Sequence, residues 1–398
     1  MSDSPNRQEE VTVQSLAFQG VAVARLSDGK VCFLKNALPG EKVQIGITAE
    51  NKSFCRGEVL EILESSAKRR KPPCPHFPAC PGCAYLHTDY ATEFAAKQEQ
   101  FRHFLLHGTE ISKKVILPAT PAEHRLQYRN KIVFHIQGNQ YCYVGEDNQT
   151  LFPAADCLLA KKELGDFIQR TPAPRNTEKA LFRWTCHDGA KLISDFKSKD
   201  APPLWDNVGT DYFFQVHPRS FFQINPEMSG KLANHILSVL KQEKPDFFVE
   251  LYSGVGVFSI LTAKALPSCE CHAVEIDKDA VDNARINAKH HGVESRCHFI
   301  AESAEKFAFR RIANAIGKQG KTCLLVDPPR TGIEAGTLRR IEEFAPDVFI
   351  YVSCSPDTLA RDLKRILPHG NYEVKSAAMF DMFPATSHFE SVCVLTKH

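Results

Sequence analysis

A cysteine at the end of an apolar segment is the first candidate for chemistry in this chain. Cys354 follows the run Val348–Ser353 and precedes Ser355 and Pro356. This pattern predicts a buried strand that opens into a loop, where a thiol can reach a cleft. Because the thiolate is the nucleophile, catalysis at neutral pH requires the thiol pKa to fall below about 8.5. The amino terminus of a following helix could supply this shift, whereas the alternative is a small buried apolar residue.

A candidate base lies near the carboxyl terminus. His388 and Glu390 stand two positions apart, immediately before the final apolar segment. Residues two apart share a face in extended chain, so both side chains can point into one cleft. A carboxylate placed in this way can act as a general base.

Glycines between two predicted strands indicate a nucleotide-type cofactor. The strand that ends at Tyr252 runs into Ser253–Gly256, and the next strand ends at Glu275. Such glycines let the backbone approach a ligand, and an acidic residue about 20 positions later can hold ribose hydroxyls. Ser259 replaces the third glycine of the dinucleotide motif. Both a dinucleotide and S-adenosylmethionine therefore remain possible from this motif alone.

The segment Asp327-Pro328-Pro329-Arg330 ends another apolar strand. Ligands of open α/β sheets bind at the carboxyl ends of the strands. The prolines cannot extend a strand ladder and stiffen the loop. Dehydrogenases have no evident use for this segment, while methyltransferases that act on bases commonly carry Asp-Pro-Pro here.

Three cysteines in a proline-rich stretch form a candidate metal site. Cys74, Cys80 and Cys83 offer three soft ligands, and tetrahedral closure needs a fourth, for which Cys142 and Cys157 compete. The spacing alone permits zinc or an iron–sulfur cluster.

The elements that must position these residues suggest three domains. Short β-like runs with turn signals predict a small barrel within residues 1–66. Residues 67–218 are mixed, with a helix expected at Thr92–Leu106 and strands at Lys131–Ile136 and Tyr141–Gly145. Residues 219–398 alternate helices with apolar strands, which predicts an α/β, Rossmann-like doubly wound sheet.

The expected strands and helices of the carboxy-terminal domain follow its apolar runs. Strands are expected at Phe247–Tyr252, Cys271–Ile276, Cys297–Ile300, Thr322–Val326, Val348–Ser353, Glu373–Met379 and Val392–Thr396. Helices are expected at Pro226–Leu240, Val257–Leu266, Lys278–His290, Ala335–Glu343 and Pro356–Leu367.

The composition is that of a globular protein: 43% of the 398 residues are hydrophobic and 24% are charged. The chain has no run of about 18 apolar residues and begins with a polar stretch, so we expect a cytoplasmic protein without a membrane span. We also expect a monomer. With a net charge of +2, nucleic-acid binding must use local patches. The sequence has two basic clusters, Lys68–Lys71 and the group Arg125, Arg129 and Lys131. Each could contact phosphates or simply face solvent. Fourteen cysteines in a reducing compartment point to metal binding or chemistry.

Four motifs in order carry a resemblance to a known family. The chain from about residue 211 resembles the RNA 5-methyluridine (uracil-C5) methyltransferases, and Ala37–Glu41 with Val43 resembles part of the TRAM domain, an OB-like RNA-binding barrel. The four motifs are Ser220–Asn225, Asp327–Arg330, Ser353–Pro356 and Asp381–Pro384 with Thr386, His388 and Glu390.

The resemblance implies roles for particular residues. Cys354 falls on the nucleophile that adds to uracil C6, and Glu390 falls on the base that removes the C5 proton. Val257 and Ser355 stand where many members have asparagine, so no role is carried over to Val257. The positions implied to contact S-adenosyl-L-methionine are Gln223, Tyr252, Glu275, Glu302 and Asp327.

The resemblance also implies a second cofactor and a substrate. In the rRNA-modifying branch of the family, a similar cysteine triad with a distant cysteine binds a [4Fe-4S] cluster, which favours Cys157 as fourth ligand and a structural role. Members with both the barrel and the cluster favour 23S rRNA, although some relatives with one of them act on tRNA. A cytosine-5 methyltransferase would have cysteine in place of Arg330. An RNA-binding factor with an inactive domain would not need both Cys354 and Glu390.

Overall fold

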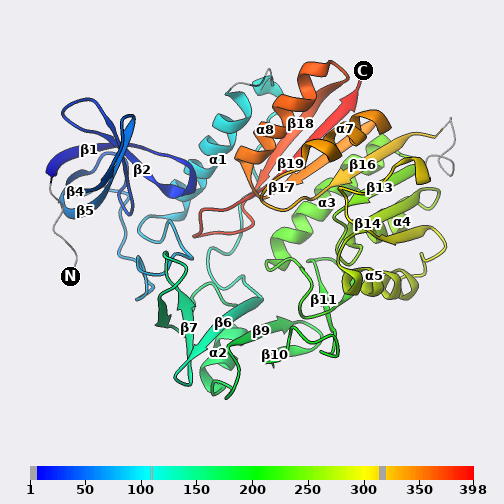
Figure 1. The fold of residues 1–398 in the computed structure, drawn as a ribbon, viewed down its shortest axis with the longest axis horizontal. Coiled ribbons are helices and arrows are strands. Elements are labelled where there is room, and N and C mark those ends of the chain that lie inside the picture. The colour runs from blue at the N-terminus through cyan, green and yellow to red at the C-terminus, as the bar shows by residue number, and fades with distance from the viewer. Residues whose placement is uncertain (1–6, 108, 110, 313–319) are drawn as a thin grey trace. The chain divides into compact units, whose positions relative to one another are not determined.

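The computed structural model describes residues 7–107, 109, 111–312 and 320–398 (Figure 1). The chain divides into two compact units. The first holds the chain up to residue 102 with residues 143–154 and 383–388, and the second holds 103–142, 155–382 and 389–398. These two units group the segments differently from the three domains expected from the sequence, and those three domains stay a prediction.

The amino-terminal strands close into a barrel in the order β1-β2-β3-β5-β4. Alternate side chains such as Val11, Val13, Val43 and Ile45 are buried, which fills the interior of the barrel. The sequence-based prediction of a small barrel is confirmed. Its strands are β1 (Gln8–Leu16), β2 (Ala22–Arg25), β3 (Val31–Leu34), β4 (Lys42–Glu50) and β5 (Phe54–Glu64), with the 3₁₀ turn η1 (Phe18–Gly20).

Helix α1 (Tyr90–Leu106) follows the barrel and forms hydrogen bonds with residues 383–388. Lys97 and Glu93 form an ion pair of 2.9 Å between fully buried side chains. Glu93 accepts the backbone N–H of Ala385, and Lys97 donates to the carbonyl of Phe383. Buried charges that are paired and hydrogen-bonded in this way fix geometry. They anchor residues 383–388, directly before Glu390.

Antiparallel strands form the middle of the chain, where β6 pairs with β9 and β7, and β9 pairs with β10. The strands expected at Lys131–Ile136 and Tyr141–Gly145 are confirmed within one residue at each end. Phe182 packs edge to face against both Phe134 and Tyr141 in the core of this sheet. The elements are β6 (Lys131–Gln137), β7 (Gln140–Val144), β8 (Leu151–Pro153), β9 (Lys179–Thr185), β10 (Gly189–Ile193), β11 (Leu204–Asn207), β12 (Phe213–Val216), α2 (Lys162–Arg170) and η2 (Lys113–Val115).

A buried ion pair links β9 to β11. Arg183 is fully buried and donates to Asp206, which is 1% exposed, at 2.9 Å, and Asn130 donates to the same oxygen at 3.2 Å. Burial raises the pKa of Asp206, while Arg183 opposes that shift. Removing one member of such a pair leaves a buried charge without compensation.

We expect Asp206→Ala to cost about 3–5 kcal/mol, which lowers the thermal unfolding midpoint by at least about 6 °C. Scanning calorimetry of the full chain measures this change. The exposed Asp200 provides the matched control, because Asp200→Ala removes a carboxylate that forms no ion pair with a buried group among the described residues. Equal midpoints for the two variants would contradict the stabilising role of the pair.

Residues 226–398 form a seven-stranded sheet in the order β15-β14-β13-β16-β17-β19-β18. Strands β13 to β17 run parallel, and β19 runs antiparallel to β17 and β18. Strands β16 and β17 are buried at every residue, so both faces of the sheet are covered. The order of the strands reverses between β13 and β16, where open α/β sheets bind ligands.

The expected elements of this domain are confirmed, with ends that differ by three residues at most. The strands are β13 (Phe247–Leu251), β14 (Glu270–Glu275), β15 (Cys297–Ala301), β16 (Thr322–Val326), β17 (Val348–Ser353), β18 (Tyr372–Phe380) and β19 (Glu390–Lys397). The helices are α3 (Pro226–Glu243), α4 (Val257–Ala265), α5 (Lys278–His290), α7 (Ala335–Phe344) and α8 (Pro356–Ile366), with η3 (Leu367–His369).

Candidate active site

A glycine turn joins β13 to α4 at the strand reversal. Gly254 and Gly256 have φ of 53° and 82°, which only glycine adopts readily. A Cβ at Gly256 would lie 2.6 Å from the ring of Phe299, whereas the space around Gly254 is open. The Gly254 N–H donates to the Glu275 carboxylate at 2.9 Å. The turn thus brings its backbone beside the carboxylate of Glu275.

A pocket lies over this turn and contains three of the predicted cofactor residues. Gln223, Tyr252 and Asp327 line it together with Gly254 and Val257. The Gln223 Oε1 atom is buried and has no hydrogen-bond partner among the described residues. Such an unsatisfied acceptor calls for a ligand group or an ordered water.

The other two predicted residues lie at the ends of the next strands. Glu275 closes β14 and accepts N–H groups from both Gly254 and Asp277. Glu302 follows β15, bonds to the Glu275 carbonyl through its backbone N–H, and forms an ion pair with Arg311. Neither side chain lines the pocket that holds Gln223.

Glu250 is a pocket residue that the sequence analysis missed. It is 1% exposed, accepts the Ser259 N–H at 2.9 Å, and has its pKa raised to about 8 by burial, with smaller effects from Asp327 and Glu275. An acidic residue inside an otherwise apolar strand was the signal that could have revealed it, because a buried carboxyl needs a specific partner.

The candidate nucleophile and base are brought together by two antiparallel strands. Cys354 follows β17 directly, Glu390 begins β19, and the paired residues Ser353 and Ser391 put the two candidates next to each other at the end of the ladder. Ser391 Oγ also donates to the Ser353 carbonyl at 2.9 Å. Glu390 is 5% exposed, and its Oε2 has no hydrogen-bond partner within the described part of the chain.

The motif around Asn225 supports this edge of the sheet. Asn225 caps α3 through the Met228 N–H and donates its side-chain amide to the Met382 carbonyl at 2.9 Å. Two of the four motifs noted in the sequence are therefore linked by a buried hydrogen bond.

Electrostatics at this edge differ from the sequence-based expectation. Burial, with the nearby charges of Glu390 and Asp327, raises the pKa of Cys354 to about 12. Burial and Asp327 also raise the pKa of Glu390, and burial raises that of Asp327 to about 7. Arg330 opposes the shifts of Cys354 and Glu390. Burial and the two acidic neighbours thus favour the neutral form of the Cys354 thiol, opposite to the shift expected from the helix that begins at Pro356.

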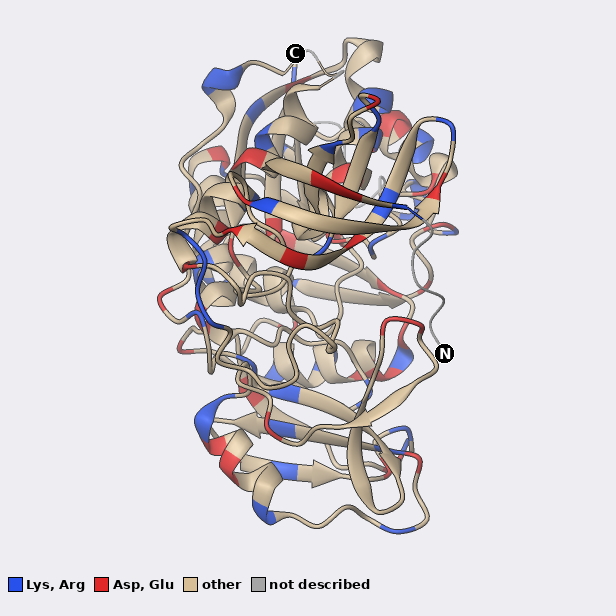
Figure 2. Cartoon of the chain, turned by 90° about the vertical axis from the view of Figure 1, so that its left-hand side faces the viewer, with Lys and Arg blue, Asp and Glu red and all other residues tan. Residues whose placement is uncertain are grey.

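The basic clusters differ in how available they are. Arg69 is taken up by Glu41, which is fully buried and accepts from the Arg69 guanidinium at 2.7 Å, so it serves the barrel rather than a phosphate. Burial, with Arg183 and Arg129 nearby, lowers the pKa of Lys131 to about 8. Figure 2 shows basic and acidic residues interspersed along the ribbon, in keeping with the small net charge.

The predicted metal ligands are each partly buried. Cys74, Cys80 and Cys83 lie in one turn-rich segment, in which the Cys80 N–H donates to the His76 carbonyl at 2.8 Å. Of the two candidates for the fourth position, Cys142 is 1% exposed within β7, whereas Cys157 is partly exposed.

Comparison with known families matches this architecture. Residues 205–398 match the tRNA (Uracil-5-)-methyltransferase family, and residues 5–60 match the TRAM domain. The carboxy-terminal domain belongs to the RNA uracil-C5 methyltransferase family. The chain is thus an S-adenosylmethionine-dependent RNA methyltransferase that also carries a TRAM domain.

Individual relatives cover nearly the whole methyltransferase. An "Uncharacterized RNA methyltransferase" of Thermotoga maritima is 27% identical over 98% of this chain and 99% of its own. The "23S rRNA (uracil(1939)-C(5))-methyltransferase RlmD" of Legionella pneumophila strain Paris is 28% identical over 97% and 96%. The solved structure of the Pyrococcus abyssi tRNA (uracil-54, C5)-methyltransferase in complex with S-adenosyl-L-homocysteine is 20% identical and has a TM-score of 0.70. The match covers 97% of this chain and 99% of that one, which shows that the two share the fold. In the described ranges, no helix is long and apolar enough to cross a membrane.

Proposed function

We propose that this methyltransferase transfers a methyl group to C5 of one uridine in 23S rRNA, acting as a cytoplasmic monomer. The observation that carries the proposal is the placement of Cys354 beside Glu390 and Asp327, at the carboxyl edge of the sheet. A nucleophile and a base at one edge are what this chemistry requires.

Cys354 and Glu390 divide the chemistry between them. Addition of the Cys354 thiolate to uracil C6 makes C5 nucleophilic, which the unmodified ring is not. When bound, S-adenosylmethionine supplies an electrophilic methyl group. Glu390 then takes the proton from C5, and the electron pair of that C–H bond restores the C5–C6 double bond while the Cys354 sulfur leaves. The target base must leave its stack to reach these groups.

The pocket at the glycine turn fits the methyl donor. Gln223 offers an unpaired buried carbonyl oxygen, and Asp327 and Tyr252 line the same pocket. The carboxylate of Glu275 lies where an acidic residue binds ribose hydroxyls in folds of this kind. We propose Glu302, at the end of β15, as the last residue of this set.

Arg330 should set the pH dependence of the reaction. Both Cys354 and Glu390 act as deprotonated groups, and Arg330 lowers both of their pKa values. In Arg330→Gln both pKa values rise further, so a smaller fraction of each group is deprotonated. The single-turnover rate of the variant should therefore lie below that of the wild type at each pH from 6 to 10, while both rates rise with pH. Rates measured from pH 6 to 10 test this. The exposed Arg339 on α7 is the control, and identical profiles for Arg330→Gln and Arg339→Gln would contradict this role.

The barrel supports RNA as the partner. A groove on it is lined by Phe33 and Phe54, whose rings pack edge to face at 5.4 Å, and by charged side chains that include Lys35, Arg56, Glu58 and Glu61. Aromatic and basic side chains in one groove are typical of surfaces that bind single-stranded nucleic acid. The relatives that match the chain end to end include the 23S rRNA enzymes, which favours rRNA.

The choice of RNA can be decided directly. A strain that lacks the gene should lose one 5-methyluridine from 23S rRNA, and the purified enzyme should transfer labelled methyl to 23S rRNA from that strain. Loss of 5-methyluridine from tRNA instead would support the second candidate function, methylation of uridine in tRNA. The archaeal tRNA enzyme that shares this fold is the reason to consider it.

We also propose a [4Fe-4S] cluster bound by Cys74, Cys80, Cys83 and Cys157. The partly buried triad supplies three thiolates from one turn-rich segment, as such a cluster requires. Its role is structural, because methyl transfer moves no electrons through the protein.

Protein purified without oxygen should contain about four irons and absorb near ~400 nm. Cys157→Ser should lose this iron, whereas Cys142→Ser should keep it. One bound zinc without iron would refute the cluster.

A further inference from the structure

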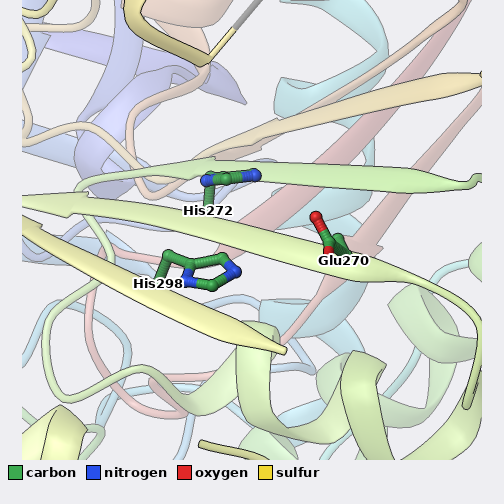
Figure 3. Close-up of side chains that lie close together, drawn as sticks. All are labelled: Glu270, His272 and His298. Carbon is green, nitrogen blue, oxygen red and sulfur yellow. The ribbon is translucent and has the colours of Figure 1, made fainter. Parts of the chain in front are cut away.

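Two histidines and a glutamate gather on the edge strand β15 and its neighbour β14 in the seven-stranded sheet, away from the carboxyl edge that holds Cys354. Glu270 and His272 are two positions apart on β14 and so share a face. His298 on β15 is the direct ladder partner of His272. Figure 3 shows the three side chains close together on neighbouring strands.

The geometry of the three groups suits a metal ion. One ligand atom from each residue can be chosen such that all lie within 4.8 Å of one another. The two imidazole rings stack with centroids 4.9 Å apart and an interplanar angle of 29°. Donors around a tetrahedral zinc at its usual bond length of ~2.1 Å are separated by about 3.4 Å. Modest side-chain rotations would close the remaining gap.

His272 supplies an independent reason to expect a ligand. It is 7% exposed, and its Nε2 atom is buried without a hydrogen-bond partner among the described residues. Buried polar atoms are normally satisfied, so an orphaned imidazole nitrogen needs an explanation.

A second cluster, Glu123, His124 and Glu227, lacks this feature. His124 contacts Glu227 at 3.0 Å, and Lys231 pairs with both glutamates at 3.0 and 3.1 Å. Its charges are already compensated by a lysine, and its histidine is exposed. This cluster therefore serves as a comparison for the first one.

We propose that Glu270, His272 and His298 bind one zinc ion, with water in the fourth position. Two neutral imidazoles and a carboxylate are a donor set that zinc accepts. The bound ion would tie edge strand β15 to β14 and leave the catalytic edge untouched. Its role is to stabilise the sheet edge, where β15 has a neighbour on one side only.

Zinc titration of the full-length, cluster-containing protein after removal of loosely bound metal tests this site. The wild-type protein should bind one more equivalent of zinc than His298→Ala, and Glu270→Gln should bind that equivalent at least about tenfold more weakly. Every variant keeps all cysteines, so the difference excludes thiolate sites. His124→Ala is the matched control and should bind as the wild type does.

Thermal unfolding provides the second measurement. Zinc should raise the midpoint of the wild type and of His124→Ala, and should have no such effect on His298→Ala. Because His298 is exposed, the variant should fold, and His298→Gln serves as a second variant. Equal zinc stoichiometry in all variants, or loss of the equivalent in His124→Ala alone, would overturn the proposal.

Discussion

Cys354→Ala is expected to reduce methyl transfer to RNA by at least about 10³-fold, because no other described group at this edge can add to uracil C6. The alanine variant should still bind S-adenosylmethionine, since Cys354 does not line the pocket at the glycine turn. Labelled methyl transfer to unmodified 23S rRNA in a single turnover measures the effect. Equilibrium binding of the cofactor, measured on the same sample, shows that the domain is folded.

The control for this variant removes a thiol elsewhere. Cys186 is exposed, and Cys186→Ala should transfer methyl at the wild-type rate. Activity that survives in Cys354→Ala would refute the covalent mechanism. A wild-type protein that binds RNA without methylating it would instead support the alternative of an RNA-binding factor with an inactive domain.

Glu390→Gln is expected to trap the reaction after methyl transfer. Glutamine cannot take the C5 proton, so the Cys354–C6 bond should persist and turnover should fall about 10²- to 10⁴-fold. The trapped species is a protein–RNA adduct that survives denaturing electrophoresis and carries the labelled methyl group. Its formation should require both Cys354 and S-adenosylmethionine, so the double variant Cys354→Ala/Glu390→Gln should give none.

A surface glutamate at the opposite end of the β18–β19 pair separates this role from a general effect of charge. Glu373 lies exposed on β18, and Glu373→Gln should turn over normally without accumulating adduct. If Glu390→Gln loses turnover but forms no adduct, Glu390 acts before methyl transfer and its assignment as the final base is wrong.

The carboxy-terminal fold could be predicted because its strands are buried on both faces. Parallel strands covered on both sides appear in sequence as continuous apolar runs, as at Val348–Ser353 and Thr322–Val326. The middle of the chain was harder to predict. Short antiparallel strands such as β10, which is only partly buried, leave a weak pattern of alternation.

Pairings between distant residues were also invisible in the sequence. The sequence around Arg183 does not indicate Asp206 as its partner. Likewise, the sequence around Lys97 does not indicate that it donates to the carbonyl of Phe383. Arg69 was read as part of a basic run, yet Glu41 binds it. Each pairing depends on which segments the fold brings together.

The sequence by itself determined which chemical groups this methyltransferase carries and the order of its motifs, because a cysteine after an apolar strand and a glycine turn are local features. Only the tertiary structure decided that Cys354 meets Glu390, since the antiparallel pairing of β17 with β19 joins residues far apart in the chain. It also decided which charges and how much burial surround the two groups. The pKa of Cys354 rises, contrary to the expectation from the adjacent helix, because burial and two acidic neighbours outweigh Arg330.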